Sequence, residues 1–231
     1  MKVKMFSMFL PLVMFANSLF NINSNVDIIE KKLEEDTRFI KVEILYPNIE
    51  GNNKKIQKNI DKLNNKIKSD IDTWIKDLKD LSVKSEHESD LYNVPFRQFQ
   101  IFSTYKVALN KENILSIPVE QYQDTGGAHG LTTKISYNFD LNTGTTLKLK
   151  DLFKNNYNYK EAINNEIKKQ ISEKSALYFD DGKSFKGIKE NQDFYITEDG
   201  IVVYFQLYEI APYSSGIREF KIPFSLVKDG I

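Results

Sequence analysis

Apolar residues along this chain follow two different periods, and the period changes near residue 98. Between residues 56 and 81, apolar side chains recur every three or four positions, with Lys, Asn and Asp between them. That spacing predicts one amphipathic helix of about seven turns. Its stripe contains Trp74 and could also face a membrane surface or a partner helix. The polar face mixes both charge signs, however, which favours packing on a sheet.

Period-two alternation predicts the strands. It first occurs in Phe39–Tyr46, where Pro47 is expected to end the pairing. It returns beyond a polar stretch at 84–93, which predicts an exposed connector. The later runs are joined by short turns and predict an antiparallel meander, with strands at 98–109, 114–122, 131–141 and 145–149.

The second half of the chain also places a helix before strands. A helix is predicted to begin near Asn158, which can cap it, and Glu161 three positions on completes a capping-box pattern. Residues 198–200, Glu-Asp-Gly, predict a hairpin turn between two later strands. Helices kept apart from runs of antiparallel strands indicate the α+β class, with antiparallel sheets, one long helix in the N-terminal half and one helix in the C-terminal half. We expect two closely packed subdomains, 37–140 and 141–231.

The N-terminus has the pattern of an export signal. Two lysines precede the apolar run Met5–Ala16, and residues 16–18 offer small side chains to a signal peptidase. The run is shorter than the roughly 20 apolar residues that a spanning helix needs. We therefore predict a signal peptide at 1–18, with an uncleaved N-terminal anchor as the alternative, and a tether or short helix at 19–36. The expected location is secreted, in the cell envelope.

Composition excludes several kinds of chemistry. The chain has no cysteine, which rules out disulfides, thiolate nucleophiles and cysteine-ligated metals. It has two histidines, His87 and His129, too few for a histidine-rich zinc site. We expect no metal and no cofactor. Basic and acidic residues both number 32, and this balance argues against a nucleic-acid partner.

Two loops concentrate the candidate binding residues. The first loop (residues 122–130) holds three glycines and a histidine, and the second loop (residues 208–216) follows an aromatic run. We expect a ligand-binding face made of Tyr122, Gly126, Gly127, His129, Tyr208, Glu209, Tyr213 and Ser214. As a general base, His129 would need a carboxylate partner, with Asp124, Asp140 and Glu209 as candidates. In a purely structural interpretation, His129 bonds the loop backbone and holds the turn.

These loops also carry a family resemblance. Gly126-Gly127-Ala128-His129, Asn138–Gly144 and Ile210-Ala211-Pro212-Tyr213 resemble one bacterial family. It is the extracytoplasmic domain shared by the anti-sigma-V factor RsiV and the non-catalytic N-terminal half of the peptidoglycan deacetylase PdaC. The resemblance implies a two-part α+β envelope domain, PdaC-like over 37–140 and RsiV-like over 141–231. For the anti-sigma factor, the family implies a receptor for lysozyme.

Two departures from the family limit what the resemblance implies. Only four residues precede the apolar run, so we expect no sigma-factor-binding segment. The sequence reaches Ile231 without a deacetylase catalytic domain, so we expect no glycan deacetylation. The prediction is a secreted, non-enzymatic cell-envelope binding module that recognises a lysozyme-like protein or a peptidoglycan fragment. The alternatives are an envelope hydrolase that uses His129 with a carboxylate, and a structural wall component. No membrane contact is expected beyond the export signal or anchor.

Overall fold

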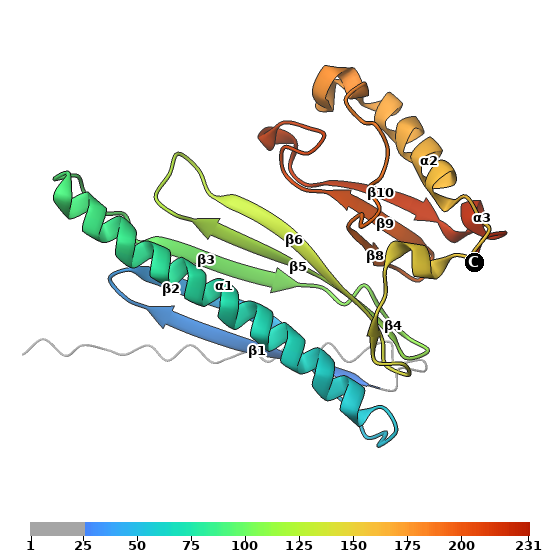
Figure 1. The fold of residues 1–231 in the computed structure, drawn as a ribbon, viewed down its shortest axis with the longest axis horizontal. Helices are drawn as coiled ribbons and strands as arrows, with labels where there is room; N and C mark the ends of the chain where they lie inside the picture. Colours follow the sequence, from blue (N-terminus) through green and yellow to red (C-terminus); the bar gives the residue numbers. More distant parts are fainter. Residues whose placement is uncertain (1–25) are drawn as a thin grey trace, which may run out of the picture.

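Two β-sheets, each covered by a helix, build the chain in the computed structural model, which describes residues 26–231 (Figure 1). The predicted signal peptide (1–18) and the first residues of the predicted tether lie outside the described residues. We call the large sheet with its helix the first subdomain, which contains β1 Asp27–Asp36, β2 Ile40–Glu50, α1 Gln57–Leu91, β3 Phe99–Tyr105, β4 Leu109–Lys111, β5 Ile114–Asp124, β6 Leu131–Asp140 and β7 Thr145–Thr146. The second subdomain contains α2 Tyr159–Glu173, β8 Phe194–Ile196, β9 Gly200–Phe205, β10 Arg218–Pro223, α3 Phe224–Val227 and the short 3₁₀ helices Leu149–Leu152, Ser175–Leu177, Phe179–Gly182 and Tyr213–Ser215.

The large sheet has the strand order β1-β2-β3-β5-β6-β7, with β4 also paired to β5. Its neighbours are antiparallel except for β2 and β3, which run parallel because α1 carries the chain back to the same end of the sheet. The small sheet has the antiparallel order β10-β9-β8. The predicted α+β class is confirmed, with its antiparallel sheets, long helix in the N-terminal half and second helix in the C-terminal half.

The long helix α1 extends further than its apolar stripe predicts. It continues to Leu91, so residues 84–91 are helical and the predicted exposed connector is wrong there. The inward positions of these turns hold Ser82 and Ser89, which are buried, and each hydroxyl donates to the carbonyl three residues earlier. Small serines therefore continue the stripe against the sheet. Within residues 26–231, no helix is long and apolar enough to cross a membrane.

Residues 27–36 form the edge strand β1, so the predicted tether or short helix is wrong for this segment. The register with β2 runs unbroken from the Asp27–Glu50 pair to the Asp36–Lys41 pair. Most side chains of β1 are exposed and charged, which is typical of a protected sheet edge. Backbone hydrogen bonds rather than apolar burial therefore hold this strand, and a search for alternating apolar residues misses it.

Strand β2 also continues through Pro47, where the sequence predicts a stop. The backbone N–H and C=O of Ile49 point away from β1, because both are bonded to the Asn64 side chain at 2.8 Å. Pro47 lies two residues earlier and has its nitrogen on the same side of the strand. The pairing with β3 ends at Ile44, so the proline removes no ladder hydrogen bond.

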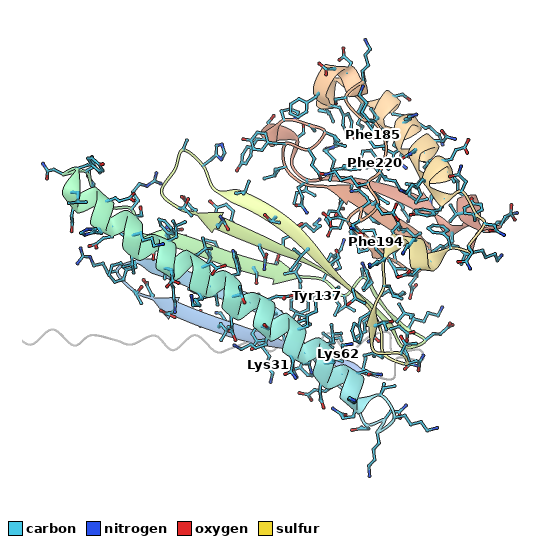
Figure 2. The ribbon with its side chains drawn as sticks, viewed as in Figure 1. Lys31, Lys62, Tyr137, Phe185, Phe194 and Phe220 are labelled. Carbon is cyan, nitrogen blue, oxygen red and sulfur yellow. The ribbon has the colours of Figure 1, made fainter. Side chains whose placement is uncertain are left out.

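Each subdomain has its own apolar core. The α1 stripe packs on the large sheet, where Trp74 is partly buried and its indole N–H donates to Gln123 at 3.2 Å. The predicted cap of α2 is confirmed, because Asn158 accepts from the Glu161 amide and donates to its carboxylate. The second core contains Ile163, Ile167 and Ile171 from α2, together with Phe185, Phe194 and Phe220 (Figure 2).

A buried polar bridge joins the two sheets. The hydroxyl of Ser116 on β5 donates to the Asn138 side chain on β6 at 2.6 Å. Asn138 in turn donates to the Phe194 carbonyl at 2.8 Å, and the Ile196 amide donates to the Ser116 hydroxyl at 2.7 Å. Ser116 and Asn138 are fully buried, and each has its partners. Such a satisfied network fixes the orientation of β8 relative to β5 and β6.

Candidate functional site

The two candidate loops meet, although they come from different subdomains. The His129 ring stacks on the Tyr213 ring, with centroids 4.2 Å apart and planes inclined by 27°. The Tyr213 hydroxyl donates to the Gly130 carbonyl at 2.9 Å. The Tyr208 ring lies 5.7 Å from the Tyr213 ring, and its hydroxyl lies 3.4 Å from Nε2 of His129. We call His129, Tyr208 and Tyr213 the aromatic platform.

The aromatic platform is open to solvent. His129 is exposed, Tyr208 is 51% exposed, and Tyr213 is half-buried beneath them. The neighbouring Ser214 is also exposed. Rings held together by stacking offer a rigid contact area to a ligand.

Tyr208 is held in an uncommon backbone conformation. Its φ of +67° lies in the left-handed region, which a bulky residue seldom adopts. The turn is closed by Glu209, whose carboxylate accepts from the Gln206 amide at 2.7 Å and from Lys189. The hydrogen bond to Glu209 raises the pKa of Lys189. Glu209 therefore shapes the second loop from within.

The first loop is braced by Arg97. One guanidinium nitrogen donates to the carbonyls of Gly126 and Gly127, at 3.2 and 3.0 Å. The Asp124 carboxylate accepts from the Gly126 amide at 2.8 Å. Gly126 has a φ of +83°, which glycine tolerates without strain. Gly126 and Gly127 therefore determine the shape of the first loop and do not belong to the aromatic platform.

Tyr122 supports the first loop from below. A Cβ added at Gly130 would lie 2.2–2.4 Å from three atoms of the Tyr122 side chain. Gly130 is buried, and its absent side chain permits this close approach. Tyr122 therefore packs against Gly130 and is not part of the aromatic platform. It positions the backbone that carries His129.

His129 has no carboxylate partner among the described residues. Its Nδ1 lies 3.1 Å from the Gly130 carbonyl, and its Nε2 faces the Tyr208 hydroxyl. The three candidate carboxylates bind other groups. Asp124 binds the Gly126 amide and Arg97, and Asp140 binds the backbone of the turn that follows it. Glu209 binds the Gln206 backbone amide and Lys189. The Gly130 carbonyl orients the His129 ring, and the histidine–carboxylate pair that the hydrolase alternative requires is not formed. Across residues 26–231, no three His, Asp or Glu side chains are grouped to hold a metal ion.

The end of α1 adds a feature that the sequence analysis missed. Leu91, Tyr92 and Val94 are 68%, 77% and 54% exposed, an unusual density of exposed apolar residues. Beside them lies a surface hollow of about 270 Å³, lined in part by Glu88, Tyr92, Val94, Phe96, Arg97 and Gly126. The available signal was the apolar group Leu-Tyr-x-Val-Pro inside a polar stretch. Arg97 connects this hollow to the first loop.

The fold and the two-loop surface define an α+β domain in which two sheet-and-helix units share one exposed face. Residues 33–132 match the family model described as "Deacetylase PdaC", and residues 150–225 match the model "Protein of unknown function (DUF3298)". These two models and the two curated relatives that follow support a shared DUF3298-type domain family, as the resemblance of the motifs indicates.

Two curated relatives come from Bacillus subtilis. The chain is 32% identical to the anti-sigma-V factor RsiV over 138 residues, which cover 56% of this chain and 47% of RsiV. It is 30% identical to the peptidoglycan-N-acetylmuramic acid deacetylase PdaC over 129 residues, which cover 54% of this chain and 28% of PdaC. The chain spans less than half the length of each of these relatives.

Two solved structures share the fold. A DUF3298 family member from Bacteroides fragilis superposes with a TM-score of 0.65 at 21% identity. A DUF3298 family protein from Pseudomonas aeruginosa superposes with a TM-score of 0.58 at 15% identity. Each match covers 90% of this chain and 94% of the other, so the likeness includes both subdomains. At these identities it shows the fold alone.

Proposed function

We propose that this chain is an extracytoplasmic, non-enzymatic binding module whose ligand is a lysozyme-like protein or a peptidoglycan fragment. The observation that carries the proposal is the aromatic platform, which two subdomains build together and leave open to solvent. The shared family with RsiV and PdaC and the predicted export signal at 1–18 support an envelope location. The absence of a carboxylate beside His129, within the described part of the chain, supports recognition rather than hydrolysis.

The breadth of the surface favours the protein ligand. Specific protein interfaces bury ~800 Å² on each partner. The aromatic platform lies on one side of the first loop, and the exposed side chains of Leu91, Tyr92 and Val94 lie near its other side. A protein can cover both areas at once. A short glycan would use the aromatic platform alone, by stacking a sugar ring on Tyr208.

Calorimetry with three variants separates these ligands. We expect the purified chain to bind hen lysozyme or soluble muropeptides, and Tyr208→Ala to weaken binding at least about tenfold, as loss of a central aromatic contact does. For a protein ligand, Tyr92→Ala also weakens binding, whereas a muropeptide is indifferent to it. Leu226→Ala is the matched control, because Leu226 is 41% exposed on α3, away from both loops (Figure 1).

Two results would refute the proposed binding function. One is the absence of heat with either ligand at high micromolar concentration of the chain. The other is turnover of a cell-wall substrate that His129→Gln abolishes, which would establish the hydrolase in its place.

A further inference from the structure

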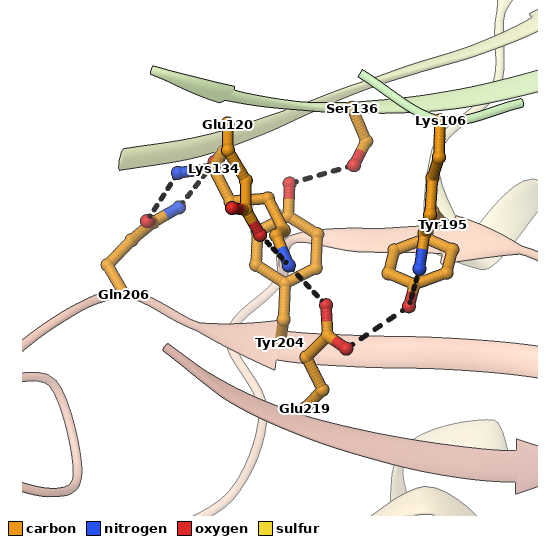
Figure 3. Close-up of polar contacts among 8 residues, drawn as sticks. All are labelled: Lys106, Glu120, Lys134, Ser136, Tyr195, Tyr204, Gln206 and Glu219. Atoms are coloured by element: carbon orange, nitrogen blue, oxygen red, sulfur yellow. Dashed lines mark hydrogen bonds and ion pairs between the residues drawn. The ribbon is translucent and has the colours of Figure 1, made fainter. Parts of the chain in front are cut away.

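A buried lysine joins the stems of both loops (Figure 3). Lys134 lies on β6, and its side chain is only 7% exposed. Its ammonium group pairs with Glu120 at 3.0 Å and with Glu219. Glu120 lies directly opposite Lys134 on β5, so these two residues form the stem of the first loop. Glu219 lies on β10, the strand that follows the second loop. One ammonium group therefore connects the two stems.

The strand before the second loop is fixed to the same lysine. The Lys134 amide donates to the Gln206 side chain at 3.0 Å, and that side chain donates back to the Lys134 carbonyl at 2.6 Å. The Gln206 side chain therefore bonds the β6 backbone as a neighbouring strand would. On the other side, the Tyr195 hydroxyl donates to Glu219 at 3.2 Å and accepts from Lys106 at 2.9 Å. Both ends of the second loop are thus connected to one residue of the first subdomain.

The environment of Lys134 favours its charged form. Burial lowers the pKa of Lys134, but the hydrogen bonds and charges of Glu219 and Glu120 raise that pKa by more, and the net shift is upward. Burial, together with the charge of Glu219, raises the pKa of Tyr195 to about 12. At neutral pH Lys134 is therefore charged and Tyr195 holds its proton. Removal of the Lys134 charge would leave two carboxylates facing each other with no cation between them.

We propose that Lys134 is a positioning residue for the aromatic platform, because it fixes the second loop against the first so that Tyr208 and Tyr213 meet His129. The benefit to a ligand rests on the proposed function, but the geometric claim does not. Lys134 makes its hydrogen bonds to the two stems, and the loops themselves are braced locally by Arg97 and Glu209. Its role is therefore the distance between loops rather than the shape of either.

Histidine NMR tests the geometric claim without a ligand. The chain has two histidines, and His87 is exposed on α1, so it serves as an internal reference. Stacking on Tyr213 shifts the His129 ring protons upfield. We expect Lys134→Met and Glu219→Gln to remove most of this upfield shift and to leave the His87 signal in place. Lys134→Arg should restore it, since a guanidinium can pair with both carboxylates.

Calorimetry provides the second measurement. If one molecule in ten of Lys134→Met retains the aromatic platform, the affinity of this variant for lysozyme or muropeptides falls about tenfold. Lys76→Met is the matched control, because it removes an exposed lysine that pairs with Asp80 on α1. It should change neither the His129 signal nor the affinity.

The outcomes distinguish this inference from the proposed function. An unchanged His129 signal in both Lys134→Met and Glu219→Gln overturns the positioning role. If the wild-type chain binds neither lysozyme nor muropeptides, the proposed function fails, and the His129 signal still decides the positioning role. If Lys134→Met does not fold, Glu219→Gln provides the test, because that side chain is 34% exposed and loses only its charge.

Discussion

Replacement of Gly130 by alanine tests how tightly the first loop is packed on its support. The added Cβ would lie 2.2 Å from the Tyr122 hydroxyl and 2.3–2.4 Å from two ring carbons. The ring would have to retreat by about 1 Å to reach ordinary contact, and overpacking of this kind costs about 1–3 kcal/mol. The backbone cannot move freely instead, because the Gly130 carbonyl accepts from Tyr213 and faces His129 Nδ1. We expect the free energy of unfolding in urea to fall by about 2 kcal/mol.

A glycine in the same loop provides the control. Gly127 has no atom within 4 Å of its added Cβ and no positive φ, so Gly127→Ala should change the free energy of unfolding by less than about 0.5 kcal/mol or raise it slightly. In a Tyr122→Ala background, where the ring is absent, Gly130→Ala should lose most of its effect. Equal costs for Gly127→Ala and Gly130→Ala, or an undiminished cost in that background, would refute the steric argument.

Three further predictions concern stability, each measured by urea unfolding. Burial raises the pKa of Tyr195 and Tyr204 above the ordinary value of about 10, and carboxylates raise that of Lys134. The unfolded chain then releases these protons first, so stability should fall as pH rises past 10, and a flat alkaline profile would contradict this. Asn158→Ala should cost about 1 kcal/mol through loss of the helix cap, with no effect on the His129 signal. Ser116→Ala should cost about 2 kcal/mol, because it leaves two buried groups unpaired, and a neutral result would mean that water replaces the hydroxyl.

Elements with a local cause could be predicted from the sequence. The cap of α2 depends on Asn158 and its neighbour in the same turn, and the α1 stripe as far as residue 81 follows from helical period alone. Helical period could not predict that the helix continues past Ser82 and Ser89. A small polar residue can face a sheet as well as solvent when its hydroxyl bonds its own helix. Strand β1 could not be predicted from its apolar pattern either, since this strand is held by backbone pairing with β2.

The candidate site shows the same limit. Both loops could be selected from their composition, because glycines and clustered tyrosines indicate special backbone and contact area. The sequence analysis expected one face from both loops but not the contacts that form it, since the His129–Tyr213 stack joins segments that share no local pattern. Lys134 was the hardest to foresee. It lies in a strand where a lysine ordinarily points to solvent, and its burial depends on Glu219, which is distant in sequence.

The aromatic platform depends on the junction between subdomains more than on either loop. Each loop is braced inside its own subdomain, so the distance between His129 and Tyr213 depends on the contacts that join the subdomains. Those contacts are the Ser116–Asn138 bridge, the Lys134 cluster and apolar packing, for example of Leu109 and Ile114 on the second core. Apolar surfaces can slide over each other with little loss, whereas a hydrogen bond weakens steeply outside a narrow range of distance and angle. A ligand that needs both loops therefore binds a surface that is organised in advance, and substitutions at the junction should lower its affinity without touching it.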